Sequence, residues 1–260
     1  MHHGYWPGGY RAGAGATSWH DAADRLTDLF IDRAALRTGT RLLDLGRGNG
    51  QPAARAVAAR GARVTGITVN PRHLAVASAG PGRFALVDAT DLPYPDESFD
   101  AAWALQSVVQ IVDQAAALRE VRRVLVPGGR FGVGDIVTHD RLPERYAASW
   151  TGTGAHTPDS LAALVEDAGF QVLEATDVTR ETRCMVSWHV DELFRRLDGL
   201  TPRAADECRE RYFDEISARH GTAAARLLAA VADYRAHPDY ARDEAAMGFV
   251  VVVARKGESR

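Results

Sequence analysis

Residue types that mark special environments are scarce in this sequence. It has two cysteines, Cys184 and Cys208, and neither stands in a Cys-x-x-Cys spacing or within a histidine pattern. A disulfide framework and a structural zinc site are therefore not expected, and we predict no bound metal. The longest apolar run, Phe249–Ala254, is far too short to span a bilayer, and no signal peptide is predicted at the N-terminus. These absences predict a reduced protein of the cytoplasm.

Basic residues are present but nowhere concentrated. Lys256 is the only lysine, arginine supplies the remaining positive side chains, and the net charge is −3. Proteins that bind nucleic acid or anionic lipid through charge carry basic blocks or stripes, which this chain lacks. The sequence therefore predicts that neither nucleic acid nor a membrane is a partner.

The chain is long enough for one domain, residues 1–260, with a sizeable core, because 46% of its residues are hydrophobic. Strand-like runs alternate with helical ones. Strands are expected at 41–45, 63–69, 83–87, 99–105, 130–137, 171–178 and 247–254, and helices at 21–36, 51–60, after Pro71, 114–125 and 158–168. This alternation predicts an α/β fold with a Rossmann-like, mostly parallel seven-stranded sheet that binds ligands at the carboxyl ends of its strands.

The alternation breaks at residues 180–243, which have the apolar spacing of helices. An insertion before the last strand would lie at the carboxyl edge of the sheet, so we expect a helical cap over a substrate pocket. The alternative is a packing element or the interface of a homodimer.

A glycine-rich loop follows the first strand of the sheet. The segment Asp44–Gly50 reads Asp-x-Gly-x-Gly-x-Gly, and a helical stretch begins directly after it. Glycines allow a tight turn and the close approach of a ligand, while the helix directs its free N–H groups at the loop. A dinucleotide fingerprint would place its third glycine at position 51, where this chain has Gln51. The spacing is that of the first motif of S-adenosylmethionine (SAM) methyltransferases, although a purely structural turn is the alternative.

Further segments resemble one family, the class I SAM-dependent methyltransferases, and within it the small-molecule enzymes of natural-product pathways such as the rebeccamycin sugar O-methyltransferase group. The matching segments are Val64–Asn70, Val87–Asp100, Leu118–Gly129, Gly248–Val250 and the N-terminal His2, Gly4, Tyr5 and Trp6. They occur in the family's order. The resemblance implies SAM as cofactor and a small-molecule substrate. Because relatives have a helix before the Gly-Tyr-Trp motif, it also implies a more open cofactor site or a start codon placed too far downstream.

The resemblance also assigns residues to the cofactor. It implies that the glycine loop faces the methionine part, that Thr68 and His73 share the ribose contacts in place of the family's usual acid, and that Asp88 accepts the adenine amino group. The cofactor-binding set is Asp44, Gly46, Gly48, Gly50, Thr68, His73, Asp88, Ala89 and Gln106. For Trp103, a place in the cofactor site and a place in the core are equally expected. Arg47 replaces a cysteine of the family and adds positive charge near the sulfonium.

The family's usual general base is missing. Its two histidines correspond to Val109 and Gln110, and neither of these can accept a proton. The remaining catalytic candidates are Asp135, which matches an acid of the family, and the two loop histidines His139 and His156. Each histidine is otherwise an ordinary polar loop residue.

Three alternative functions follow from these observations. The first is a methyltransferase acting on a secondary metabolite, for which we expect O-methylation. An acidic phenol, a carboxylate or a free amine would need little help from a base. The alternative is a methyltransferase-like cyclase or pericyclase that keeps the SAM fold and transfers no methyl group; a SAM-binding auxiliary subunit is a third reading.

Overall fold

The computed structural model describes residues 3–11, 18–46, 50–77, 80–140, 156–235 and 237–258. The chain divides into two compact units. The sheet unit comprises residues 24–179 and 246–260, and the helical unit comprises residues 1–23 and 180–245.

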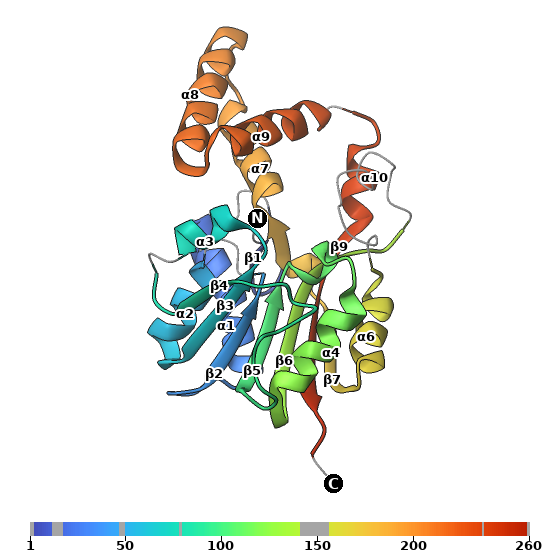
Figure 1. Cartoon of the computed structure of the whole chain (residues 1–260). Helices are drawn as coiled ribbons and strands as arrows, with labels where there is room; N and C mark the ends of the chain where they lie inside the picture. Colours follow the sequence, from blue (N-terminus) through green and yellow to red (C-terminus); the bar gives the residue numbers. More distant parts are fainter. Residues whose placement is uncertain are drawn as a thin grey trace. The chain divides into compact units, whose positions relative to one another are not determined.

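The sheet unit is built on the mostly parallel seven-stranded sheet that the sequence predicts. Its strands are β2 (Arg41–Leu45), β3 (Arg63–Thr68), β4 (Arg83–Leu86), β5 (Phe99–Leu105), β6 (Leu125–Thr138), β7 (Phe170–Asp177) and β9 (Met247–Lys256). Their spatial order is β4-β3-β2-β5-β6-β9-β7 (Figure 1). Only β9 is antiparallel, and it pairs with β6 on one side and β7 on the other.

Strand β6 begins five residues earlier than the predicted strand at 130–137. The Pro127-Gly128-Gly129 stop signal does end the preceding helix, but Leu125 already pairs with Phe99 of β5. The pairing shifts register before it resumes at Ala101, and Gly128 has a φ of +75°. A glycine in that conformation lets the strand absorb the irregularity. The Pro-Gly-Gly signal therefore predicted the end of the helix correctly, but it did not indicate that the strand begins before it.

Helices cover both faces of the sheet. These are α1 (Trp19–Arg33), α2 (Gln51–Arg60), α3 (Pro71–Ala77), α4 (Gln114–Val124) and α6 (Pro158–Asp167). Residues of α4 and α6, such as Leu118 and Leu161, share a buried cluster with Leu43 and Phe131 of the sheet. On the other face, Phe30 of α1 fills the space that Gly134 leaves open, because a Cβ atom there would overlap its ring.

Two helices of the sheet unit begin at clear caps. Asp113 accepts a hydrogen bond from the Ala116 N–H and caps α4. Thr157 and Ser160 form a capping box at the start of α6. These caps fix where α4 and α6 begin at the carboxyl edge of the sheet.

The helical unit contains α7 (Met185–Leu197), α8 (Pro202–His220), α9 (Thr222–Tyr234) and α10 (Tyr240–Ala245). Helices α7, α8 and α9 pack around Leu193, Tyr212 and Leu228. Two strands that the sequence does not signal, β1 (His3–Tyr5) and β8 (Thr182–Cys184), pair antiparallel and join the N-terminal segment to this unit. No helix among the described residues is long and apolar enough to cross a membrane.

A charged network ties together distant segments of the helical unit. The buried carboxylate of Asp191 accepts hydrogen bonds from Tyr10 Oη (2.9 Å), Arg183 Nε (3.1 Å) and Arg235 Nη1 (2.6 Å). Arg183 also donates to Glu244 of α10 at 2.6 Å. Because the carboxylate is shielded from water, these bonds are stronger than equivalent bonds at the surface.

Candidate functional site

The predicted site residues cluster at the carboxyl edge of the sheet. Asp44 and Gly46 lie at the end of β2, Thr68 ends β3, and Gln106 follows β5. Asp88 and Ala89 follow β4. Since this is the edge where open α/β sheets bind ligands, the topology brings most of the predicted set to one side of the sheet.

The glycine loop requires glycine at its first position. Gly46 has a φ of +69°, and a Cβ atom there would overlap the Cβ of Ser107. Gly50 is also left-handed, with a φ of 81°, and it begins α2 without a capping side chain. In the first turn of α2, Pro52 has no N–H, and the Ala54 N–H donates to the Gly50 carbonyl at 3.0 Å. Gly48 and its neighbours Arg47 and Asn49 lie outside the described residues.

Two residues beside the loop are buried. Asp44 is almost wholly enclosed between Gly66 of β3 and Trp103 of β5. Trp103 is fully buried within the strand, which makes it a core residue of the sheet.

The polar residues beyond β3 and β4 are held by local hydrogen bonds. Thr68 Oγ1 accepts the Asn70 N–H at 3.1 Å, and His73 is exposed on α3. Asp88 is exposed, and its Oδ1 accepts the N–H and the hydroxyl of Thr90, both at 2.9 Å. These bonds hold the pKa of Asp88 below its usual value. It is thus an ionised acceptor in a fixed orientation, with buried Ala89 beside it.

Two apolar side chains at this edge escaped the sequence analysis. Val69 directly follows β3 and is 69% exposed, while Leu86 ends β4 and is 55% exposed. Thr68 pairs with Leu86 in the sheet, so the two apolar side chains belong to adjacent strand ends. Exposed apolar groups next to an oriented carboxylate suit a flat ring with a polar edge. An apolar residue immediately after a strand was the available signal.

A tight turn follows β5 at the centre of the edge. Gln106 has a φ of +57°, and its N–H donates to the Gly134 carbonyl at 2.7 Å. The 3₁₀ helix η1 (Val108–Gln110) comes next. Val109 is buried and Gln110 is exposed. The two positions that replace the family's histidines therefore carry no group that titrates near neutral pH.

Asp135 lies in β6 and is only 1% exposed. Its carboxylate accepts the Val109 N–H at 3.0 Å and the Ile136 N–H at 2.9 Å. Burial raises its pKa to about 7, while the hydrogen bonds from the amides of Val109, Ile136 and Val108 oppose that rise. The described contacts of this carboxylate are thus with backbone amides.

The two candidate histidines occupy different surroundings. His156 is half-buried, with Nε2 at 2.7 Å from Gln114 Oε1 and Nδ1 at 3.1 Å from Ser160 Oγ, and burial lowers its pKa. His139 Nε2 lies 3.3 Å from Asp177 Oδ2 and 3.3 Å from Thr179 Oγ1. The structure thus links His156 through Gln114 to the turn that Asp135 contacts, and it places His139 in a separate cluster.

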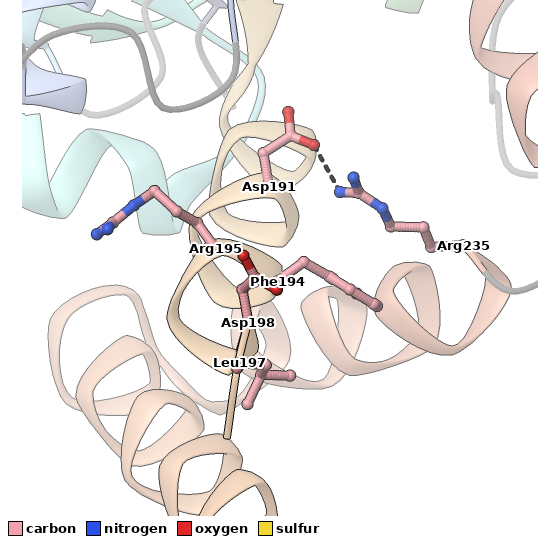
Figure 2. Close-up of a pocket in the computed structure, with 7 residues that line it drawn as sticks. Asp191, Phe194, Arg195, Leu197, Asp198 and Arg235 are labelled. Atoms are coloured by element: carbon pink, nitrogen blue, oxygen red, sulfur yellow. Dashed lines mark hydrogen bonds and ion pairs between the residues drawn. The ribbon is translucent and has the colours of Figure 1, made fainter. Parts of the chain in front are cut away.

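The helical unit has a hollow of its own. Its volume is about 470 Å³. It is lined by Asp191, Phe194, Arg195, Leu197, Asp198, Gly199 and Arg235. Figure 2 shows most of these side chains on α7. Asp191 points toward Arg235, which follows α9 and forms an ion pair with it, whereas Arg195 points away from Arg235. The Arg235 guanidinium also lies 4.6 Å from the centre of the Phe194 ring. The lining is therefore partly apolar and partly charged.

Comparisons with known proteins point in one direction. A family profile described as a methyltransferase domain matches residues 43–133. The chain is 37% identical to methyltransferase GfsG of Streptomyces halstedii over 198 residues, which is 70% of each chain. It is 32% identical to the 27-O-demethylrifamycin SV methyltransferase of Amycolatopsis mediterranei, over 98% of this chain and 89% of the other.

Solved structures agree with this result. The [4+2]-cyclase SpnF superimposes with a TM-score of 0.75 at 35% identity, over 100% of this chain and 88% of that one. A geranyl diphosphate C-methyltransferase from Streptomyces coelicolor, solved with S-adenosyl-L-homocysteine, has a TM-score of 0.67 at 15% identity and shares the fold.

Proposed function

We propose, from the premise that this chain belongs to the class I S-adenosylmethionine-dependent methyltransferases, that it methylates an oxygen atom of a secondary metabolite. The observation that carries this proposal is the likeness to the 27-O-demethylrifamycin SV methyltransferase along 98% of the chain. That relative's name specifies transfer to oxygen. The glycine loop and the polar residues at the carboxyl edge of the sheet support the same activity here.

The residues at the edge fit the cofactor. At the end of β2, Gly46 leaves the backbone bare because a Cβ atom there would overlap Ser107, and Gly50 begins α2 without a capping side chain. On the far side of the edge, Val69 and Leu86 offer an apolar surface, and Asp88 offers an acceptor for an amino group. We assign the methionine part to the loop, the ribose to Thr68 and His73, and the adenine to Val69, Leu86, Asp88 and Ala89.

Methyl transfer at such a site depends mainly on alignment. Bound there, SAM supplies an electrophilic methyl group on a positively charged sulfur. The chain has to hold the substrate oxygen in line with that group and keep water away. The turn Gln106–Gln110, at the centre of the edge, is the segment that we assign to this task.

The lack of a general base at the turn favours a substrate whose acceptor oxygen is acidic. Val109 and Gln110 cannot accept a proton, and the Asp135 carboxylate is buried against backbone amides. A phenol or carboxylic acid that is largely deprotonated needs little help from a base, whereas an unactivated sugar alcohol does. We therefore propose a phenolic or carboxylic oxygen as the acceptor. Asp135, His139 and His156 stay candidates for assisting the proton.

The helical unit is proposed to bind the body of the substrate. Its hollow combines Phe194 and Leu197 with charged side chains, which suits an apolar molecule that carries oxygen functions. Hydrogen exchange with bound product tests this role, since protection should extend over 180–243. Protection confined to 41–110 would instead make the segment a packing element or the interface of a homodimer.

The methyl-transfer proposal has a direct test. The protein is incubated with SAM and a panel of polyketide phenols, and the product mass and the S-adenosylhomocysteine released are measured together. We expect equal amounts of methylated product and S-adenosylhomocysteine. A product that has the mass of the substrate and forms without release of S-adenosylhomocysteine would contradict methyl transfer.

A second function, cyclisation, is favoured by one observation. The SpnF cyclase is similar to this chain over its whole length at 35% identity. A [4+2]-cyclase would join a diene and an alkene of one substrate with no change in mass, and S-adenosylhomocysteine would support the reaction as well as SAM. The same assay therefore separates the two functions.

A further inference from the structure

The turn after β5 depends on partners outside itself. A three-residue 3₁₀ helix has few hydrogen bonds of its own, and a non-glycine residue with a φ of +57°, such as Gln106, adopts an unfavourable conformation. Within the turn, Gln110 Nε2 donates to the Gln106 carbonyl at 3.0 Å. Neighbouring elements must therefore supply most of what fixes its shape.

Asp135 supplies one set of contacts. From β6 its Oδ2 accepts the Val109 N–H at 3.0 Å, and Oδ1 accepts the Ile136 N–H at 2.9 Å. A carboxylate that is 1% exposed and bonded to amides is well placed to orient a backbone. It is poorly placed to collect a proton from a substrate.

Gln114 and His156 supply a second set. Gln114 is buried, and its Nε2 donates to the Val108 carbonyl at 3.1 Å. Its Oε1 lies 2.7 Å from His156 Nε2, and because an amide oxygen can only accept, that nitrogen carries the hydrogen. Nδ1 of the ring faces Ser160 Oγ at 3.1 Å. The imidazole thus acts through Gln114, and both its nitrogens have protein partners.

The turn in turn contacts the glycine loop. Ser107 Oγ donates to the Leu45 carbonyl at 2.8 Å, and its Cβ occupies the space beside Gly46. A displacement of η1 therefore moves Ser107 against the residue that begins the loop. The shape of the turn and the shape of the loop are coupled.

We infer that Asp135 and His156 are positioning residues for the Gln106–Gln110 turn. Asp135 holds the Val109 amide, and His156 holds the Val108 carbonyl through Gln114, so that together they fix the shape of the glycine loop that binds the cofactor. This role rests on the proposed function for what the loop binds. It replaces proton transfer as the task of these two side chains.

Binding of S-adenosylhomocysteine, measured by calorimetry, tests the inference. Asp135→Asn, Gln114→Ala and His156→Leu should each weaken binding about three- to tenfold. Gln114→Ala combined with His156→Leu should be no worse than Gln114→Ala alone, because the two act in series. His156→Gln keeps a donor near Nε2 and should restore binding to within about twofold of wild type. Gln171→Ala, at the other end of the sheet unit, is the matched control and should change nothing.

The outcomes separate the two proposals. Unchanged affinity in all the folded variants, or equal loss in His156→Gln and His156→Leu, would overturn the positioning role. Failure of the wild type to bind S-adenosylhomocysteine would refute the cofactor assignment instead. Amide hydrogen exchange then still tests the turn: Val108 and Val109 should exchange at least about tenfold faster in Gln114→Ala and Asp135→Asn than in Gln171→Ala. Equal protection in all three would overturn the inference.

Discussion

Replacement of Asp135 by asparagine should make the stability of the protein less sensitive to pH. The carboxyl has a pKa of about 7 in the folded protein because it is buried, against an ordinary value of 3.8. Between these two values the unfolded chain has lost the proton while the folded protein keeps it. Rising pH therefore favours unfolding across this window, and the penalty is complete above pH 7. Asparagine cannot ionise, so the variant escapes this penalty.

The size of the effect follows from the same two values. One pKa unit is worth about 1.4 kcal/mol, so the full penalty is roughly 4 kcal/mol. The part that falls between pH 5 and pH 8 is roughly 2–3 kcal/mol. Asparagine also loses one acceptor for the amides of Val109 and Ile136, which costs about 1–3 kcal/mol at every pH. Only the change with pH identifies the buried carboxyl.

Thermal unfolding at pH 5 and pH 8 measures this change. At roughly 2–4 °C per kcal/mol, the Tm of the variant relative to wild type should rise by about 5–10 °C between the two conditions. His156 titrates in both proteins and cancels from the difference. Asp100→Asn is the matched control: its pKa is held below the ordinary value by Arg41, so its effect should be constant over this range. A Tm difference for Asp135→Asn that is equally constant would refute the buried, raised pKa.

Three further predictions concern the loop, the adenine acceptor and the helical unit. Gly46→Ala should weaken S-adenosylhomocysteine binding at least about tenfold, or about 1.4 kcal/mol, because the added Cβ would overlap Ser107. Calorimetry measures the affinity. Gly39→Ala, where a Cβ meets nothing, is the control for the left-handed φ. Asp88→Ala should cost about 1–3 kcal/mol of binding and abolish discrimination against inosine-type analogues; equal discrimination in both proteins would exclude the contact. Asp191→Ala leaves two arginines and a tyrosine without their shared acceptor and should destabilise the helical unit by about 3–5 kcal/mol, seen as faster hydrogen exchange in α7 and α9, whereas unaltered exchange would count against the network.

The sheet could be predicted from the sequence because its signals are local. Alternation of apolar strands and helices, with Pro127-Gly128-Gly129 just after the end of α4, fixes the element order without any tertiary information. The three-residue strands β1 and β8 gave no such signal, since each is defined only by the other, far apart in the sequence.

The cofactor edge was predictable in part. Glycines and carboxylates at strand ends have recognisable spacing, and the structure places most of them at one edge. The contacts that orient the turn after β5 were not predictable. Gln114 looks like an ordinary first residue of a helix, and its bond to Val108 depends on how α4 packs. In the sequence a buried aspartate such as Asp135 is identical to an exposed one, and only the fold shows which aspartate is buried and has a raised pKa.

The place of β9 in the sheet has a consequence for how the sheet is completed during synthesis. Among the strands of the sheet this one, residues 247–256, is made last, yet it lies between β6 and β7 and is bonded to both. Until it leaves the ribosome, β7 has no neighbour in the sheet, and β6 exposes an unpaired edge on that side. A nascent chain or a fragment lacking these residues therefore presents two bare strand edges, which is the condition that promotes aggregation and chaperone binding.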